Sequence, residues 1–287
     1  MKQILVISGK GGTGKTVVSG CFAVLAENKV IVDADVDAAN LHLLLNPKIK
    51  EEHDFIGGKI ARIDKEKCIE CGACREVCRF DSITEDFEII PVYCEGCTIC
   101  WYFCEQGAIV LEDRISGKYY ISETKYGDFV HARLGIAQEN SGKLVAHLRE
   151  VAKEIANEKG RDYIIIDGPP GVGCPVMASM TGVDVAVVVT EPTLSGLHDL
   201  ERVVQLAKHF KVELKVVINK FDLNPEVSQK IESYLEENQL ELAGKIPFSR
   251  DVLESVKLGK PFIEYARETN KGEEVVKVLE EVWEKVR

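Results

Sequence analysis

Apolar residues follow two patterns that alternate along most of the 287-residue chain. Short runs of consecutive Val, Ile and Leu are typical of strands that are buried on both faces. Apolar residues spaced three and four positions apart are typical of helices with one buried face. The expected strands are residues 1–7, 29–33, 163–167, 183–190, 214–219 and 242–247, and the expected helices are 17–25, 38–45, 141–158, one from about 175, 195–210, 225–238 and two more at the C-terminal end. This order predicts an α/β fold in which helices cover both faces of a parallel sheet.

The alternation stops between residues 57 and 125. That stretch contains short apolar runs, turns and eight of the ten cysteines. We therefore expect two domains, a discontinuous α/β domain of residues 1–56 and 126–287 and an inserted domain of residues 57–125.

A glycine-rich loop joins the first expected strand to the first expected helix. Its sequence fits the phosphate-binding pattern G-x4-G-K-[ST] at every fixed position. Backbone N–H groups of such a loop surround phosphate oxygens, and the helix N-terminus adds a positive dipole. Lys15 is placed to reach the β and γ phosphates of a nucleotide, and the Thr16 hydroxyl is placed to bind Mg²⁺. The expected nucleotide contacts in this loop are Gly9, Gly11, Gly12, Thr13, Gly14, Lys15 and Thr16.

Further candidate residues lie at the ends of the expected strands. They are Ser8, Asp33, Asp167, Thr190, Asn219 and Pro247. Ligands of open α/β sheets bind at the carboxyl edge of the strands. The sequence therefore predicts one nucleotide site that is assembled from several loops.

Eight cysteines form two runs with the same spacing, C-x2-C-x2-C-x3-C. The first run is Cys68, Cys71, Cys74 and Cys78, and the second is Cys94, Cys97, Cys100 and Cys104. The repeat extends outward at the same offset, because Ile63 matches Ile89 and Ile83 matches Ile109. This pattern indicates an internal duplication with two metal-binding runs. Two four-cysteine zinc sites are the alternative, although zinc ribbons use C-x2-C pairs separated by longer loops.

The formal net charge of −11 lies mostly in the cysteine-rich stretch. From Cys68 to Asp113, ten Asp and Glu residues stand against Arg75 and Arg79, which gives −8 (2 minus 10) and leaves −3 for the remainder. Nonspecific DNA binding needs a basic face, so we expect no nucleic-acid partner. An acidic surface suits an electron carrier that docks on a basic partner, although a merely solvated face has the same composition.

The location of the protein can be inferred from its apolar runs and its cysteines. No run is long enough to cross a bilayer, and no secretory leader opens the chain. Cysteines clustered in two tight runs beside a phosphate loop favour a reducing compartment over a disulfide framework. The acidic face of the last helix disfavours membrane binding, so its apolar face is expected to pack on the core. We therefore expect a cytoplasmic protein with no stable membrane insertion.

The sequence Lys-Gly-Gly-Thr-Gly-Lys-Thr, which begins at Lys10, resembles the deviant phosphate loop of the MinD/ParA/Mrp superfamily of ATPases. The resemblance implies a SIMIBI/MinD-like P-loop fold, ATP and Mg²⁺ as cofactors, and slow hydrolysis stimulated by a partner or by dimerisation. It also implies an ATP-dependent homodimer in which Lys10 reaches the nucleotide of the partner subunit.

The same resemblance assigns roles to residues at the other strand ends. Asp167 would orient Mg²⁺, and Asp35 would position the attacking water, with Asp37 as a second candidate. Asn219 would contact adenine. Pro247, at the end of the last expected strand, is a further expected nucleotide contact. The sequence from Asn219 to Asp222 also looks like the guanine-reading motif N-K-x-D, but the phosphate loop favours ATP.

The cysteine spacing resembles that of bacterial two-cluster ferredoxins. This implies an inserted α+β ferredoxin-like domain with two [4Fe–4S] clusters, in which the fourth cysteine of each run binds the cluster of the other run. Carried over, one cluster would take Cys68, Cys71, Cys74 and Cys104, and the other would take Cys94, Cys97, Cys100 and Cys78. Arg79 and Glu105 stand where those ferredoxins have proline.

Two further segments resemble parts of related ATPases. Cys174 lies seven positions after Asp167, where the nitrogenase iron protein has a cysteine that binds a cluster between two subunits. Cys174 is therefore a candidate interface ligand, and a buried thiol is the alternative. Cys21 lies on an apolar helix and is expected to be a core residue. Residues 135–143 resemble a segment that lies near the dimer face in ATPases with inserted ferredoxins.

Two functions of different classes remain open. The first is a nucleotide-gated, low-potential electron carrier that docks on a redox partner with a basic face. The alternative is an Fe–S assembly or carrier ATPase of the Mrp type, which delivers clusters to a client protein. The two complete ligand sets favour the first function, and Cys174 favours the second.

Overall fold

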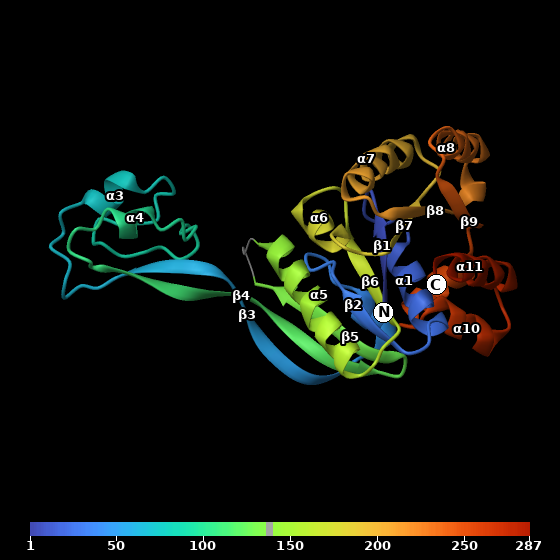
Figure 1. Ribbon diagram of the computed structural model, residues 1–287, viewed down its shortest axis with the longest axis horizontal. Coiled ribbons are helices and arrows are strands. Elements are labelled where there is room, and N and C mark those ends of the chain that lie inside the picture. The colour runs from blue at the N-terminus through green and yellow to red at the C-terminus, as the bar shows by residue number, and fades with distance from the viewer. Residues whose placement is uncertain (136–139) are drawn as a thin grey trace. The chain divides into compact units, whose positions relative to one another are not determined.

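The computed structural model describes residues 1–135 and 140–287 and divides the chain into two compact units (Figure 1). The first unit contains Met1–His53, Tyr119–Arg133 and Ser141–Arg287. The second contains Asp54–Lys118 together with Leu134, Gly135 and Asn140.

A sheet with the strand order β3-β4-β5-β2-β6-β1-β7-β8-β9 organises the first unit. The strands are β1 (Lys2–Ser8), β2 (Lys29–Asp33), β3 (Lys48–Ile63), β4 (Ile109–Thr124), β5 (Gly127–Leu134), β6 (Tyr163–Pro170), β7 (Val185–Thr190), β8 (Glu213–Asn219) and β9 (Glu241–Ile246). Neighbouring strands from β5 to β9 are all parallel. Every residue of β2 and β7 is buried, as expected for apolar strands covered on both faces. The predicted parallel α/β sheet is therefore confirmed.

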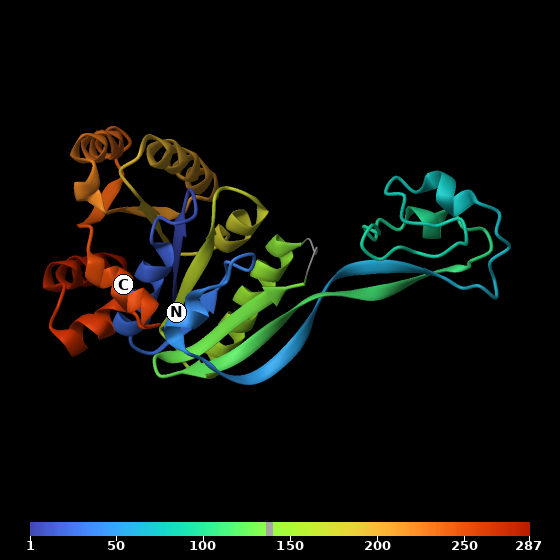
Figure 2. The ribbon, with the colours of Figure 1, turned by 180° about the vertical axis from the view of Figure 1, so that it is seen from behind.

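Helices cover both faces of this sheet. Helices α1, α10 and α11 pack together on one face, and α5, α6 and α7 pack on strands β1, β2, β6 and β7 from the other (Figures 1 and 2). The helices of this unit are α1 (Lys15–Leu25), α2 (Leu41–Leu45), α5 (Ser141–Glu158), α6 (Cys174–Met180), α7 (Leu194–Phe210), α8 (Pro225–Glu237), α9 (Arg250–Lys257), α10 (Phe262–Thr269) and α11 (Glu273–Val286), with a 3₁₀ turn at Phe221–Leu223.

Several expected elements differ from those observed. The region after residue 45 contains two 16-residue strands, β3 and β4, where short strands were expected. Strand β5 was not predicted, and three helices rather than two follow β9. Helix α2 begins at Leu41 instead of residue 38. Strands β3 and β4 carry exposed polar residues along much of their length, so they lack the apolar run that reveals a buried strand.

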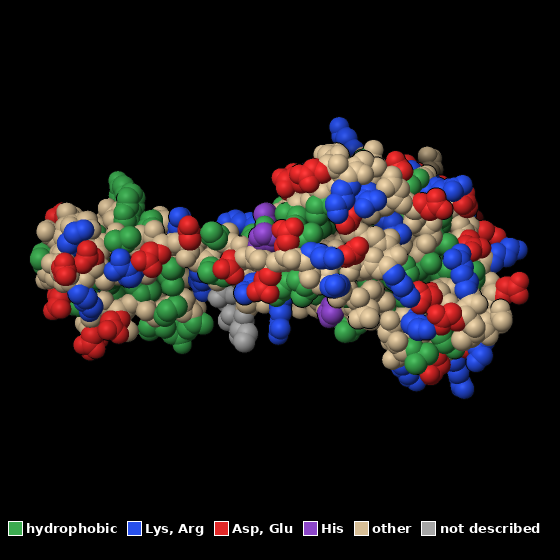
Figure 3. All heavy atoms as spheres, turned by 90° about the horizontal axis from the view of Figure 1, so that it is seen from below, with side chains coloured by type: hydrophobic (Ala, Val, Ile, Leu, Met, Phe, Trp, Pro, Cys, Tyr) green, Lys and Arg blue, Asp and Glu red, His purple; other side chains and the backbone are tan. Residues whose placement is uncertain are grey.

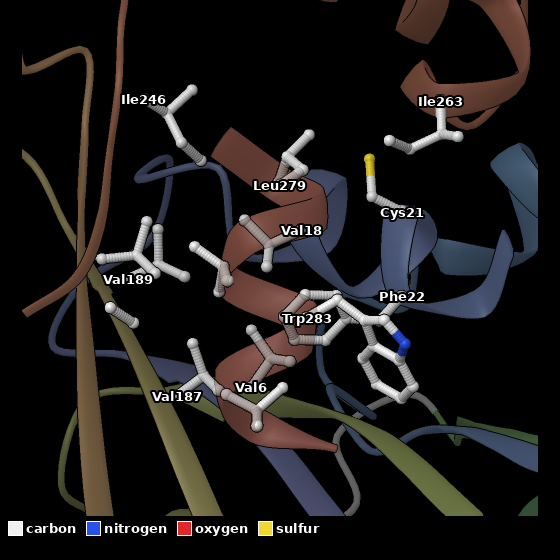
Figure 4. Close-up of a cluster of buried hydrophobic side chains, with 14 of the residues drawn as sticks. Val6, Val18, Cys21, Phe22, Val187, Val189, Ile246, Ile263, Leu279 and Trp283 are labelled. Atoms are coloured by element: carbon white, nitrogen blue, oxygen red, sulfur yellow. The ribbon is translucent and has the colours of Figure 1, made fainter. Parts of the chain in front are cut away.

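The main core lies between the sheet and helices α1, α10 and α11 (Figure 4). The Trp283 ring contacts Phe22 and Tyr163, with ring centroids 5.4 and 5.5 Å away. The apolar face of α11 is thus buried, which confirms that it packs on the core. Cys21 is also buried in this cluster, as predicted, and burial raises the pKa of its thiol to about 12.

The second unit repeats its local structure at the 26-residue offset of its cysteine runs. Helix α3 (Ala73–Val77) in the first run corresponds to α4 (Ile99–Tyr102) in the second. Pairs of residues at this offset also share the left-handed conformation. They are Glu70 and Gly96, Gly72 and Thr98, and Asp81 and Gly107. Six of the eight cysteines of this unit, all but the exposed Cys71 and Cys97, pack with Ile63, Ile83 and Ile109 in a small core of their own.

Candidate functional site

The glycine-rich loop runs from the end of β1 to the start of α1. Gly12 and Gly14 are left-handed, with φ of 83° and 96°. A Cβ atom on Gly14 would lie 2.3 Å from Nδ2 of Asn219, so this position also needs glycine for space. Asn219 Nδ2 donates to the Thr13 carbonyl at 2.7 Å. The end of β8 therefore supports the loop directly.

The loop presents unpaired polar groups that suit a phosphate. No side chain caps α1, which leaves the first N–H groups of that helix available. The Thr13 hydroxyl is buried and has no hydrogen-bond partner among the described residues. A buried polar group without a partner is costly, so this loop fits a bound anion.

Lys15 lies between two of the predicted carboxylates. Its Nζ is 3.0 Å from Asp167 Oδ1 and 3.3 Å from Asp35 Oδ2. The Thr16 hydroxyl donates to Asp167 Oδ2 at 2.9 Å. Burial lowers the pKa of Lys15, but the charges of Asp167 and Asp35 outweigh burial and hold this pKa above its ordinary value. The side chains of Lys15, Thr16, Asp35 and Asp167, predicted from separate parts of the sequence, thus lie in contact with one another or with a shared neighbour.

Asp33 has a positioning role at this point. Its carboxylate accepts the backbone N–H of Asp35 at 3.2 Å and that of Leu41 at 3.1 Å. Burial and the charge of Asp167 raise the pKa of Asp33 to about 8. Asp33 therefore fixes the loop that carries Asp35, whereas Asp37 is exposed.

Ser19 is a site residue that the sequence analysis missed. Its hydroxyl donates to Asp167 Oδ1 at 2.7 Å and is fully buried. Ser19 lies four residues after Lys15 and therefore on the same face of α1. That spacing is the signal that could have identified it.

Lys10 is bound within its own chain. Its Nζ is 2.8 Å from Glu191 Oε1 and donates to the hydroxyls of Thr193 and Ser195 at 3.1 and 3.0 Å. The other Glu191 oxygen lies 3.5 Å from Lys220 Nζ. Burial raises the pKa of Glu191, but the hydrogen bonds and charges of Lys10 and Lys220 together outweigh burial, so the net pKa is lowered. Glu191 follows the expected end of β7 by one residue and was not among the predicted site residues.

The remaining predicted residues lie at or near the same edge of the sheet. Asn219 is opposite Ile246 in the register of β8 and β9, so Pro247 follows beside it. Asp222 accepts the backbone N–H of Phe248 at 2.7 Å. Cys174 begins α6 and is exposed, so it is not the buried thiol of the alternative. Four of the nine residues in the resemblance at 135–143, residues 136–139, lie outside the described residues.

The comparison with known families agrees with this geometry. A family model described as the CobQ/CobB/MinD/ParA nucleotide binding domain matches residues 4–262. The chain belongs to this family. The MinD/ParA proteins of this family are P-loop ATPases, and the glycine-rich loop at residues 9–16 is the candidate phosphate-binding element of this chain.

Individual relatives of this family cover most of the chain. An uncharacterized protein of Methanocaldococcus jannaschii is 41% identical over 226 residues, which is 77% of this chain and 79% of the relative. The septum site-determining protein MinD of Synechocystis sp. is 25% identical over 276 residues, or 92% of this chain and 82% of the relative. The structure of MinD complexed with Mg-ADP from Pyrococcus horikoshii has a TM-score of 0.60 at 19% identity and covers 99% of this chain and 95% of that one. This structural likeness shows a shared fold.

The eight clustered cysteines lie in the second unit. Cys68, Cys71, Cys74 and Cys104 line one small, mostly apolar cavity. Burial, together with smaller contributions from the charges of Cys94, Cys97 and Cys78, raises the pKa of the Cys100 thiol to about 11. Cys104 of the second run thus lies with cysteines of the first run, and Cys78 of the first run lies near the second run.

Two features are absent from the described residues. Across residues 1–135 and 140–287, no group of three or more His, Cys, Asp or Glu side chains is arranged to hold a metal ion. In the same residues, no helix is both long and apolar enough to cross a membrane.

Proposed function

We propose that this chain is a dimeric, Mg²⁺-dependent ATPase whose nucleotide state controls an iron–sulfur electron-transfer unit. The observation that carries the second half of this proposal is the exchange of cysteines between the two runs. Cys104 of the second run lines a cavity with three cysteines of the first run, and Cys78 of the first run lies near the second run.

ATP is the nucleotide that the site residues favour. Asp222 would need a free carboxylate to read guanine, but it accepts the backbone N–H of Phe248 and so holds the loop after β9. Asn219 lies against the phosphate loop, next to the position expected for the base. The related Pyrococcus horikoshii MinD was solved with Mg-ADP, which supports a Mg²⁺-bound adenine nucleotide here.

The carboxylates and Lys15 supply the groups that hydrolysis requires. Mg²⁺ usually keeps several waters and takes only one or two carboxylates together with phosphate oxygens. Asp35 and Asp167, together with the Thr16 hydroxyl, would hold it in this way, so a site with only two carboxylates fits the ion. Bound Mg²⁺ would neutralise charge on the phosphates, while Asp35 positions the attacking water and Lys15 stabilises the γ-phosphate.

The second unit fits two [4Fe–4S] clusters. A cube of this kind binds one cysteine at each of four separate iron atoms, so its ligands surround a space and do not converge on one ion. The apolar cavity lined by Cys68, Cys71, Cys74 and Cys104 has this character. The other set would be Cys94, Cys97, Cys100 and Cys78. Each cluster, when bound, would take up and release one electron at low potential.

A short covalent path links the nucleotide site to the second unit. Asp33 accepts the N–H of Leu41, the first residue of α2, and β3 begins three residues after α2 ends. Strand β3 then continues into the second unit. A rearrangement around Asp35 on ATP binding would therefore act on α2 and β3, which makes this segment the proposed coupling element.

Iron content tests the cluster assignment. In anaerobically purified full-length protein, Cys104→Ser should lower the iron content by about one cluster, or four iron atoms per chain. Cys104 belongs to the second run, but it is assigned to the cluster of the first run. Cys174→Ser is the matched control and should keep the wild-type iron content. Equal iron in wild type and Cys104→Ser would refute the assignment.

The alternative, an Fe–S carrier ATPase of the Mrp type, rests on Cys174. This cysteine is exposed at the start of α6, and a Cβ atom on Gly142 of α5 would lie 3.3 Å from its carbonyl oxygen. If the carrier function is correct, Cys174→Ser should reduce iron content and abolish ATP-dependent cluster transfer to an apo-ferredoxin. Wild-type iron in this variant favours the electron carrier.

A further inference from the structure

A run of large apolar side chains stands in solvent on and beside α4. The exposed fractions are 38% for Ile99, 51% for Trp101, 78% for Tyr102 and 53% for Phe103. The rings of Tyr102 and Phe103 contact each other, with centroids 5.5 Å apart. We call these four residues the α4 surface. Exposed aromatic residues gathered in this way mark interaction sites.

The internal duplication shows that the cysteine runs do not require these side chains. At the offset of 26 residues, the first run has Ala73, Arg75, Glu76 and Val77 in place of the α4 surface. Helix α3 nevertheless forms there, preceded by the same left-handed backbone as α4. The aromatic residues of α4 therefore serve a purpose that the first run does not share.

Acidic side chains flank the α4 surface in the sequence. Glu95 and Glu105 are exposed, and neither forms an ion pair among the described residues. By contrast, Glu112 and Asp113 of β4 pair with Arg62 and Lys59. Figure 3 shows hydrophobic side chains on the surface of the second unit, with both acidic and basic side chains among them. The surface thus combines an apolar centre with unpaired negative charge.

We propose that the α4 surface is the docking face for an electron-transfer protein whose cofactor lies beneath an apolar patch ringed by Lys and Arg. This inference rests on the proposed iron–sulfur function. Residues Trp101–Phe103 lie in the sequence between Cys100, a proposed ligand of one cluster, and Cys104, a proposed ligand of the other. A partner docked here is therefore next to both proposed clusters. Trp, Tyr and Phe dominate the centres of protein interfaces, and complementary charge guides the encounter.

The charge of this unit argues against a membrane as the occupant. The stretch from Cys68 to Asp113 carries −8, which an anionic lipid surface would repel. In the proposed transfer, one electron leaves the second unit, which is oxidised, and enters the cofactor of the partner, which is reduced. No covalent bond forms or breaks.

Binding of cytochrome c, a basic protein with an apolar haem edge ringed by lysines, tests the docking face. Calorimetry at low salt, with both proteins oxidised and full length, measures association without electron transfer. The variant W101R/Y102E/F103V installs the residues of the first run and leaves the net charge unchanged. We expect its dissociation constant to rise at least tenfold, with wild-type iron content. After reduction with dithionite and removal of the excess, the variant should reduce dichlorophenolindophenol at the wild-type rate, because its clusters still supply the electrons. Y102A, which removes a mostly exposed ring, should weaken binding in the same direction.

The outcomes separate this inference from the proposed function. If wild type and both variants bind cytochrome c equally, the docking face is wrong. It is also wrong if R75A/E76A on α3 loses as much affinity for cytochrome c as W101R/Y102E/F103V. Binding of wild type to phosphatidylglycerol vesicles that W101R/Y102E/F103V abolishes would also overturn it, in favour of a membrane. A wild-type protein that contains no iron and does not reduce the dye would instead refute the iron–sulfur function itself.

Discussion

Lys10 and Glu191 form an ion pair within one chain, with Nζ 2.8 Å from Oε1. Thr193 and Ser195 accept further hydrogen bonds from the same amine. The family resemblance places this lysine at the nucleotide of a partner subunit. If Lys10 takes that position in a dimer, the intrachain pair competes with dimer formation, because one amine cannot occupy both positions.

Removing the charge of Glu191 should release Lys10. We expect Glu191→Gln to dimerise with ATP at a several-fold lower protein concentration, because a partly exposed pair contributes about 0.2–1 kcal/mol. Sedimentation velocity of full-length protein with ATP measures this shift. Lys220→Met removes the other partner of Glu191 and leaves the Lys10 contact, so it should resemble wild type. Unchanged or weaker dimerisation of Glu191→Gln would show that the pair does not restrain Lys10.

Asp35 and Asp37 differ sharply in their surroundings. Asp35 is buried beside Lys15, whereas Asp37 is exposed two residues later. We expect Asp35→Asn to reduce ATP turnover by about 100-fold or more while ATP binding stays within about threefold. Asp37→Asn should keep wild-type turnover. Turnover assays with titration of a fluorescent ATP analogue measure both quantities, and comparable losses in the two variants would refute the role of Asp35.

Ser19 should act through Asp167. Because its hydroxyl donates to Asp167 Oδ1, Ser19→Ala frees this carboxylate to rotate away from Mg²⁺. The half-saturating Mg²⁺ concentration for ATP turnover should rise about tenfold. Ser179→Ala is the matched control, since that buried hydroxyl donates only to the Val176 carbonyl of α6. A normal Mg²⁺ dependence in Ser19→Ala would mean that Ser19 serves packing alone.

His131 should make stability depend on pH. Burial, with a smaller contribution from the charge of His42, lowers the pKa of His131 to about 4. Between about pH 6.5 and 4 the unfolded chain binds a proton that the folded chain does not, so stability is present above pH 6.5 and is lost as the pH falls. The loss is at most about 3 kcal/mol.

Urea unfolding at pH 7 and pH 5 measures the contribution of His131. His131→Phe should lose less stability over this interval than wild type, and His198→Gln, at an exposed position, should match wild type. If wild type and His131→Phe have the same dependence, His131 is not the titrating group.

Local sequence patterns predicted the strands in which every residue is buried. Strand β2 is five consecutive buried residues, and the sequence shows it directly as an apolar run. Strand β3 contains Gly57 and Gly58 and exposes most of its first seven residues, so its sequence looks like a turn. Its formation depends on pairing with β4, which is distant in the sequence. Tertiary pairing decides such strands more than local preference does.

The same distinction applies to the site. Lys15 and Thr16 belong to a contiguous motif, and Asp167 ends an apolar strand, so each has a local signal. Ser19 acquires its role only from a hydrogen bond to a residue 148 positions away. Glu191 is likewise defined by its contact with Lys10 across the fold. The four-residue spacing from Lys15 marks the face of α1 on which Ser19 lies, but the bonding partners of Ser19 and Glu191 could not be derived from spacing along the chain.

Electron paramagnetic resonance of the anaerobically purified, dithionite-reduced full chain, recorded before and after addition of MgATP, tests the central proposal most directly. We expect signals from two reduced [4Fe–4S] clusters per chain, with a change in their shape or intensity when MgATP binds. Spectra that lack cluster signals, or cluster signals that are identical with and without MgATP, would contradict a nucleotide-controlled iron–sulfur unit.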